Sequence, residues 1–125
     1  MDKNKIKSFT DLFAWQEGHK LVLTIYQIIN KFPKSESYAL ADQMRRCVVS
    51  ITSNIAEGFS RSGKKEKIQF YFISLGSITE LQNQLLITRD LGYIKDAQFR
   101  EIADKTVTVQ KLLNGLISSI KRCNF

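Results

Sequence analysis

The most regularly spaced polar residues of this chain lie between residues 43 and 57. They are Gln43, Arg46, Ser50, Asn54 and Glu57. Because they recur at intervals of three or four, a helix would place them within one narrow arc. Such an arc could bind a partner or a nucleic acid, or it could form a hydrogen-bonded network between helices or subunits. We favour the network, because Ser and Asn inside a bundle need hydrogen-bond partners. Ser77 and Glu80 of a later helix would join it, with Glu80 as a candidate partner for an arginine.

Positive charge gathers around the break that follows this stripe. The cluster consists of Arg61, Lys64, Lys65 and Lys67, and Arg45 and Arg46 could extend it into a patch at one end or side of the fold. Arginine can hold a phosphate through two hydrogen bonds, and lysine holds it as a point charge. The cluster predicts a nucleic-acid interface based on phosphate contacts. The alternative is a solvated loop with no ligand.

Catalytic and metal-binding patterns are missing from the sequence. His19 is the single histidine, and the two cysteines, Cys47 and Cys123, match neither a zinc site nor a disulfide framework. We expect His19 to lie at the edge of an apolar stripe, where it needs no metal. Nothing in the spacing supports a triad of Ser50 with His19. We therefore predict a protein that is not an enzyme, with no catalytic residue, metal or cofactor.

The composition limits the class of partner. The chain has 125 residues, enough for one domain, and 19 Lys and Arg against 12 Asp and Glu give a formal charge of +7. This excess favours nucleic acid, acidic protein or anionic lipid as a partner. Residues 1–10 contain Lys3, Lys5 and Lys7 without an apolar stretch, so we expect a flexible basic arm rather than a secretion signal. With no run of ~18 apolar residues, we expect a cytoplasmic protein without a membrane partner.

Four segments with helical periodicity must position these side chains. They run from Asp11 to Phe32, from Ser37 to Glu57, from Lys64 to Leu91 and from Ala97 to Arg122. Pro33, Gly58 and Gly92 are expected to end the first three, and Asp96 to cap the fourth. Similar lengths and short connections predict an all-α fold, an antiparallel up-down-up-down four-helix bundle over residues 11–125.

Apolar residues define the expected inward face of each segment. In the first they are Ala14, Gly18, Leu21, Ile25, Ile28 and Phe32, and in the second Leu40, Met44, Cys47, Val48, Ile51 and Ile55. In the third they are Ile68, Phe72, Leu75, Ile78, Leu85 and Leu86, with Leu81 nearby. In the fourth they are Phe99, Ile102, Val109, Leu113, Leu116 and Ile120. These stripes predict which residues form the common core.

Several short motifs carry a family resemblance. The chain opens with F-x-D-L-x-x-W-Q from Phe9, continues with S-I-x-x-N-I-A-E-G-x-x-R from Ser50 to Arg61, and reaches L-G-Y at Tyr93. In this order, the stretch from Phe9 to Tyr93 resembles the 23S rRNA intervening-sequence proteins, small bacterial proteins of which some are encoded within large-subunit ribosomal RNA genes. The fourth segment adds only its helical period to the resemblance.

The resemblance implies a four-helix bundle that assembles into a homopentameric ring. The chain is also similar to the accessory variability protein of diversity-generating retroelements, a basic pentameric bundle that works with a reverse transcriptase and binds nucleic acid. The family has no established enzymatic activity. We therefore expect an oligomeric protein that binds RNA or DNA through phosphates. The alternative is an interaction scaffold whose ring binds a protein such as a polymerase or another acidic protein.

Overall fold

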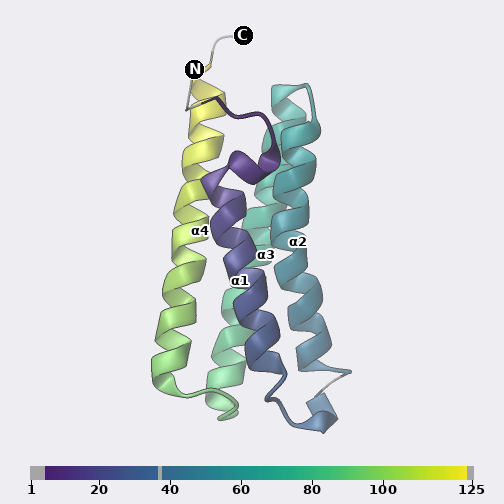
Figure 1. The fold of residues 1–125 in the computed structure, drawn as a ribbon, viewed down its shortest axis with the longest axis vertical. Helices are drawn as coiled ribbons and strands as arrows, with labels where there is room; N and C mark the ends of the chain where they lie inside the picture. Colours follow the sequence, from purple (N-terminus) through teal and green to yellow (C-terminus); the bar gives the residue numbers. More distant parts are fainter. Residues whose placement is uncertain (1–4, 37, 124–125) are drawn as a thin grey trace.

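Four long helices form the molecule, which a computed structural model describes for residues 5–36 and 38–123. They are α1 (Phe13–Ile29), α2 (Leu40–Ser60), α3 (Lys64–Asp90) and α4 (Asp96–Arg122), with short 3-10 helices η1 (Phe9–Asp11) and η2 (Lys34–Glu36) before α1 and α2. Successive helices run antiparallel and pack on one another, and α4 returns to pack on α1 (Figure 1). The predicted all-α four-helix bundle is confirmed.

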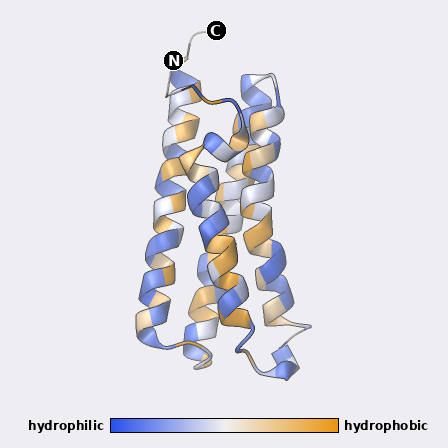
Figure 2. Ribbon diagram, viewed as in Figure 1, coloured by the Kyte–Doolittle hydropathy of each residue, from blue (hydrophilic) through white to orange (hydrophobic). Residues whose placement is uncertain are grey.

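The core lies between the helices along the expected stripes. Every residue of the stripes predicted for the first two segments is buried, including Phe32 beyond the end of α1. In α4, Ile102, Val109 and Leu113 are buried and Phe99 is partly buried. Hydrophobic residues alternate with hydrophilic ones along the helices (Figure 2), as expected of elements that bury one side only.

The inward face of α3 differs from the prediction. Phe72 and Leu86 were expected in the core and are exposed instead. The residues of α3 that are buried are Tyr71, Ser74, Ser77, Ile78, Leu81, Gln84, Leu85 and Thr88. α3 itself carries apolar residues on all of its sides, so the periodicity of the sequence does not identify which side is buried. The side that faces α2 contains hydroxyl groups, and Ser74 Oγ donates to the Ile51 carbonyl over 2.8 Å.

The segment before α1 forms the short helix η1, which has a cap of its own. The Ser8 side chain accepts from the Thr10 N–H (3.2 Å) and so caps η1 and not the first long helix. Asp11 Oδ2 accepts from the N–H groups of Lys7 (2.9 Å) and Ser8 (3.0 Å), and these bonds lower the pKa of the Asp11 carboxyl. Ordered structure thus begins within the expected arm of residues 1–10, and Lys3 lies outside the described residues.

Helix boundaries also shift at the next connection. α1 ends at Ile29 and not at Phe32, and the chain then passes through η2 before α2 begins at Leu40. The expected start at Ser37 lies outside the described residues. The rings of Phe32 and Tyr93 lie 5.2 Å apart, so the α1–α2 connection packs against the α3–α4 connection.

Two glycines have different roles from one another. Gly58 was expected to end the second helix but lies inside α2, where a Cβ would stand 2.7 Å from Tyr71 Cε1, so it permits close approach of α3. Gly92 ends α3 as predicted, with φ +78°. The N–H of Gly92 bonds to the Arg89 carbonyl (2.9 Å) and that of Tyr93 to the Thr88 carbonyl (3.0 Å). These two bonds form a Schellman motif. Asp96 is the first residue of α4 and not its cap.

Candidate nucleic-acid interface

Positive charge is unevenly distributed between the two ends of the bundle. The N-terminal segment, the α2–α3 turn and the last turns of α4 meet at one end (Figure 1). With six residues of each adjoining helix included, the basic residues there are Lys5, Lys7, Arg61, Lys64, Lys65, Lys67, Lys121 and Arg122, against the acidic Asp11, Glu17, Glu57 and Glu66. We name this the basic end.

The other end is close to neutral. By the same definition its basic residues are Lys31, Lys34, Arg45, Arg89, Lys95 and Arg100, and its acidic ones are Glu36, Asp42, Asp90, Asp96 and Glu101. We name this the neutral end. The two ends therefore differ in net charge, and the basic end is the one at which an anion would be more favoured.

Arg61 occupies the α2–α3 turn as the residue after the last helical residue of α2. Its guanidinium lies 3.5 Å from the Glu57 carboxylate and 4.8 Å from the centre of the Phe70 ring. The ion pair is solvent-exposed and therefore weak. A phosphate could replace Glu57 as the partner of the guanidinium while the aromatic ring keeps it in place.

The ammonium groups of Lys64 and Lys67 donate hydrogen bonds to backbone carbonyls. Lys67 Nζ donates to the Phe59 carbonyl over 2.7 Å, near the end of α2, and partial burial lowers the pKa of its ammonium. Lys64 Nζ donates to the Cys123 carbonyl just beyond α4. Carbonyls at the ends of helices lack partners within the helix, and cations are favoured there. The structure therefore gives both lysines a capping role.

Two other cations of the basic end are exposed to solvent, whereas the Lys121 ammonium lies over the Phe72 ring, 5.4 Å from its centre. Lys65 is exposed on the first turn of α3, and Arg122 is exposed on the last turn of α4. Sequence reasoning missed Lys121 and Arg122 as members of the site. The signal was present in the predicted topology, because antiparallel neighbours bring the end of the fourth helix beside the start of the third.

Arg45 and Arg46 lie far from this group. Arg46 and Arg61 are separated along α2 by roughly 22 Å at 1.5 Å per residue. Arg46 pairs with Asp42 over 3.1 Å one turn away on the same helix. The six basic residues singled out in the sequence thus fall into two separate places and do not form one patch.

The expected polar network forms only at its centre. Ser50 Oγ lies 2.9 Å from Ser77 Oγ, and Asn54 Nδ2 donates to the Ser50 carbonyl (2.8 Å) and to its Oγ (3.0 Å). Gln43 is exposed on α2, and Glu80 makes no ion pair with any described residue. Arg46 pairs with Asp42 within α2, and Glu57 pairs with Arg61 just after the end of α2. The centre of the stripe therefore joins α2 to α3, and its ends face solvent.

The remaining candidate groups are not arranged as a reactive site. His19 is exposed and stacks on Trp15 at 4.8 Å, and residues 5–36 and 38–123 contain no group of three His, Cys, Asp or Glu placed to hold a metal. Burial is the main cause that raises the pKa of Cys47 to about 12, and the nearby Glu80 carboxylate adds to it, so the thiol stays protonated.

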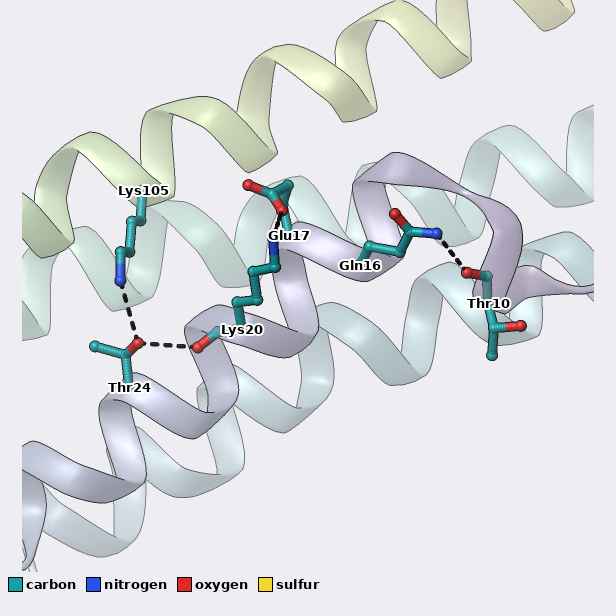
Figure 3. A network of polar contacts seen from close by, with 6 residues as sticks. All are labelled: Thr10, Gln16, Glu17, Lys20, Thr24 and Lys105. Atoms are coloured by element: carbon teal, nitrogen blue, oxygen red, sulfur yellow. Dashed lines mark hydrogen bonds and ion pairs between the residues drawn. The ribbon is translucent and has the colours of Figure 1, made fainter. Parts of the chain in front are cut away.

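A polar row along α1 connects its neighbours (Figure 3). Gln16 Nε2 donates to the Thr10 carbonyl (2.9 Å), and Lys105 of α4 reaches Thr24 Oγ1 (3.5 Å). These contacts tie η1 and α4 to α1.

Among the described residues, no helix is long and apolar enough to cross a membrane.

Fold and charge together define a small four-helix bundle protein with a basic end. A family model for the 23S rRNA-intervening sequence protein matches residues 10–115. The chain therefore belongs to the 23S rRNA-intervening sequence protein family. The match extends into α4, beyond the motifs that end at Tyr93.

A solved structure has the same fold. It is a protein with unknown function from the S23 ribosomal protein family from Bacteroides thetaiotaomicron, and the alignment covers 84% of this chain and 95% of that chain with a TM-score of 0.78. Sequence identity is 20%, so the likeness concerns the fold alone. No curated protein matches this chain.

Proposed function

We propose that the protein assembles into a ring of identical copies and binds nucleic acid through phosphate contacts at the basic end. The single observation that carries this proposal is the meeting of three basic segments, far apart in sequence, at one end of the bundle. Exposed cations there, such as Lys65 and Arg122, are the groups that displace condensed counterions from a phosphate backbone.

The arrangement favours backbone contacts over base recognition. The exposed cations extend from the ends of separate elements, and residues 5–36 and 38–123 present no single basic helix face that could lie in a groove. Affinity should therefore depend strongly on salt and weakly on sequence.

Assembly would multiply a weak contact. A single copy offers a few free cations, whereas five copies, the number that the family resemblance implies, carry five times the formal charge of +7. Linked sites act together on one polyanion, so the ring would bind far more tightly than a single copy.

Anisotropy titrations test the proposal directly. Labelled single-stranded RNA, structured RNA and duplex DNA are titrated with the protein at about 50 mM and about 200 mM salt, and we expect affinity to fall steeply between them. A basic-end triple variant, Lys7→Glu with Lys65→Glu and Arg122→Glu, should weaken binding by about 100-fold or more.

A matched control changes the charge equally at the other end. Lys31→Glu with Lys34→Glu and Arg100→Glu should alter affinity by about threefold or less, because screening limits the reach of distant charges. Equal losses in both triples would show that net charge, and not the basic end, attracts the ligand. If the assembled wild type fails to bind at low salt, the nucleic-acid function is wrong.

One observation favours a protein partner as a second candidate function. A groove of about 500 Å³ lies beside the basic end between the N-terminal segment, α1 and α4, and its floor includes Leu12, Leu112 and Leu116. Phe13 at its edge is 71% exposed. An acidic protein segment with an aliphatic side chain would fit the apolar floor and Lys5. Binding of such a partner should weaken with Phe13→Asp and depend less on salt than binding of nucleic acid does.

A further inference from the structure

One outward side of α3 is unusually apolar for a solvent-exposed helix surface. We define the α3 strip as Phe72, Ile73, Gly76, Thr79, Glu80, Asn83, Leu86 and Ile87. Its four large apolar side chains are exposed by 51% (Phe72), 47% (Ile73), 42% (Leu86) and 41% (Ile87). The core uses the opposite side of α3, and although the Lys121 ammonium of α4 lies 5.4 Å from the centre of the Phe72 ring, all four side chains remain exposed.

Spacing and charge mark the strip as a place for helix packing. The pairs Phe72–Ile73, Thr79–Glu80 and Leu86–Ile87 recur every seven residues, which keeps them on one side of the helix over roughly 21 Å. Glu80 is the single charged residue between Lys67 and Arg89. Depletion of charge with retention of aromatic and aliphatic groups is typical of the core of a protein interface.

A different side of the same chain offers a complementary surface. A shallow groove of about 490 Å³ between α1 and α2 is lined by Tyr26, Asp42, Arg45, Arg46, Val49, Ser50 and Ser53. Tyr26 and Val49 supply exposed apolar area. Asp42 already pairs with Arg46, and Arg45 makes no ion pair among the described residues.

We propose that the α3 strip of one copy packs into the α1–α2 groove of a second copy, with Glu80 facing Arg45. This inference rests on the proposed assembly and names its interface. Each surface carries one charge that lacks an ion pair within the described chain, and the two charges are opposite in sign. Complementary charges within an apolar contact fix the register and reject wrong partners.

A two-fold contact of strip on strip fits less well. If two α3 strips packed antiparallel, with Phe72–Ile73 of one against Leu86–Ile87 of the other, both Glu80 carboxylates would meet near the axis. Burying two like charges together is costly. The strip lies on α3 and the groove is lined by α1 and α2, so the contact joins two different surfaces. Contacts between two different surfaces are those that close rings of more than two subunits.

Sedimentation velocity of the full chain across micromolar concentrations, without nucleic acid, tests this interface. We expect a mass several times 14.4 kDa for the wild type. Ile73→Asp and Ile87→Asp should each raise the dissociation constant by about 100-fold or more, because each buries a carboxylate in an apolar contact. Phe13→Asp introduces the same carboxylate at a more exposed apolar residue on another side of the bundle, and it should leave assembly intact. Circular dichroism verifies that each variant stays helical.

A charge exchange tests the partner surface. Glu80→Arg and Arg45→Glu should each disrupt assembly, and the double variant should restore it to within about threefold of wild type. If the wild type assembles but the Ile73 and Ile87 variants assemble equally well, the α3 strip is wrong while assembly stands. If single exchanges disrupt and the double does not restore, or if a dimer forms that Arg45→Glu leaves intact, the groove is wrong. A wild type that stays at 14.4 kDa overturns this interface and the proposed ring together.

Discussion

The two ends of the bundle are closed in different ways. At the neutral end, the backbone itself terminates α3 through Gly92, and the Phe32–Tyr93 pair packs one connection against the other. At the basic end, ammonium groups add to the backbone bonds that close α2 and α4. Lys67 donates to the Phe59 carbonyl near the end of α2, and Lys64 to the Cys123 carbonyl after α4.

This contrast divides the cations of the basic end into two groups. Lys64 and Lys67 satisfy helix carbonyls, so removing them should affect folding. Lys65 and Arg122 remain exposed, and removing them should affect ligand binding. A count of lysines and arginines thus overstates the charge that is free to meet a phosphate.

The largest effect on stability is expected at Gly58, beside the basic end. In Gly58→Ala, a Cβ 2.7 Å from Tyr71 Cε1 would force α2 and α3 apart. Because the new Cβ would also stand 3.0 Å from Phe70 Cβ, we expect a cost near the top of the ~1–3 kcal/mol typical of overpacking, and a net loss of about 2 kcal/mol after the ~1 kcal/mol that alanine gains in a helix. Gly115→Ala, in α4 with open space around the new Cβ, should instead stabilise. Urea unfolding measures both, and equal stabilisation by the two would refute the close approach.

The neutral end should respond to its own glycine by a smaller amount. Gly92 adopts φ +78°, which an alanine reaches only at a cost of about 1–2 kcal/mol. Gly92→Ala should therefore destabilise the bundle, and Gly92→Asn less so, because asparagine tolerates this conformation better. Thermal unfolding of the three proteins gives the order, and an alanine variant as stable as wild type would show that α3 ends in another way.

Much of the fold was predictable from the sequence, because apolar periodicity in α1, α2 and α4 specifies one buried side. In α3 the prediction failed at Phe72 and Leu86, since apolar residues on both sides erase that signal. The prediction that Gly58 ends a helix was wrong, because the sequence alone does not distinguish a glycine that ends a helix from one that lets a neighbouring helix approach closely. Only the packing against Tyr71 distinguishes the two roles.

The candidate site was predictable in part. The basic turn could be seen in the sequence, but the separation of Arg46 from Arg61 depends on the direction of α2. The capping bonds of Lys64 and Lys67 depend on where carbonyls of other segments end. Lys121 and Arg122 required the topology, because they adjoin the turn in space and not in the chain.

A lysine comparison sharpens the division of the basic end. Lys67→Met keeps the length of the side chain and loses the bond to Phe59, and we expect a loss of about 1 kcal/mol in the free energy of unfolding. Lys65→Met should leave stability within about 0.5 kcal/mol of wild type, because Lys65 is an exposed surface residue.

The two variants should behave oppositely toward nucleic acid. The slope of log affinity against log salt concentration reports the number of phosphate contacts. Lys65→Met should lower it by the equivalent of about one contact, and Lys67→Met should change it less. Denaturant unfolding and anisotropy on the same samples supply both values. If Lys67→Met lowers affinity as much as Lys65→Met without destabilising the protein, the capping assignment is wrong.

The smallest expected effect is on stability at alkaline pH and concerns Tyr71, which is buried beside the basic end. Burial raises the pKa of Tyr71 to about 12. Below about pH 10 the phenol is protonated in both the folded and the unfolded state, so it adds no pH dependence. Between about pH 10 and the folded pKa, the unfolded chain releases the proton while the folded one retains it, so the free energy of unfolding falls as pH rises.

Tyr71→Phe should remove this part of the alkaline loss. At about pH 10.5 the difference from wild type should be roughly 0.5–1 kcal/mol after comparison with about pH 8. The loss caused by Cys47, whose pKa burial also raises to about 12, should persist in the variant. Tyr38→Phe, at a 97% exposed tyrosine near the neutral end, should keep the wild-type pH dependence. If Tyr71→Phe shows the same alkaline loss as wild type, the packing of Tyr71 against Gly58 does not exclude water from the phenol, and the close α2–α3 contact at the basic end is looser than its geometry indicates.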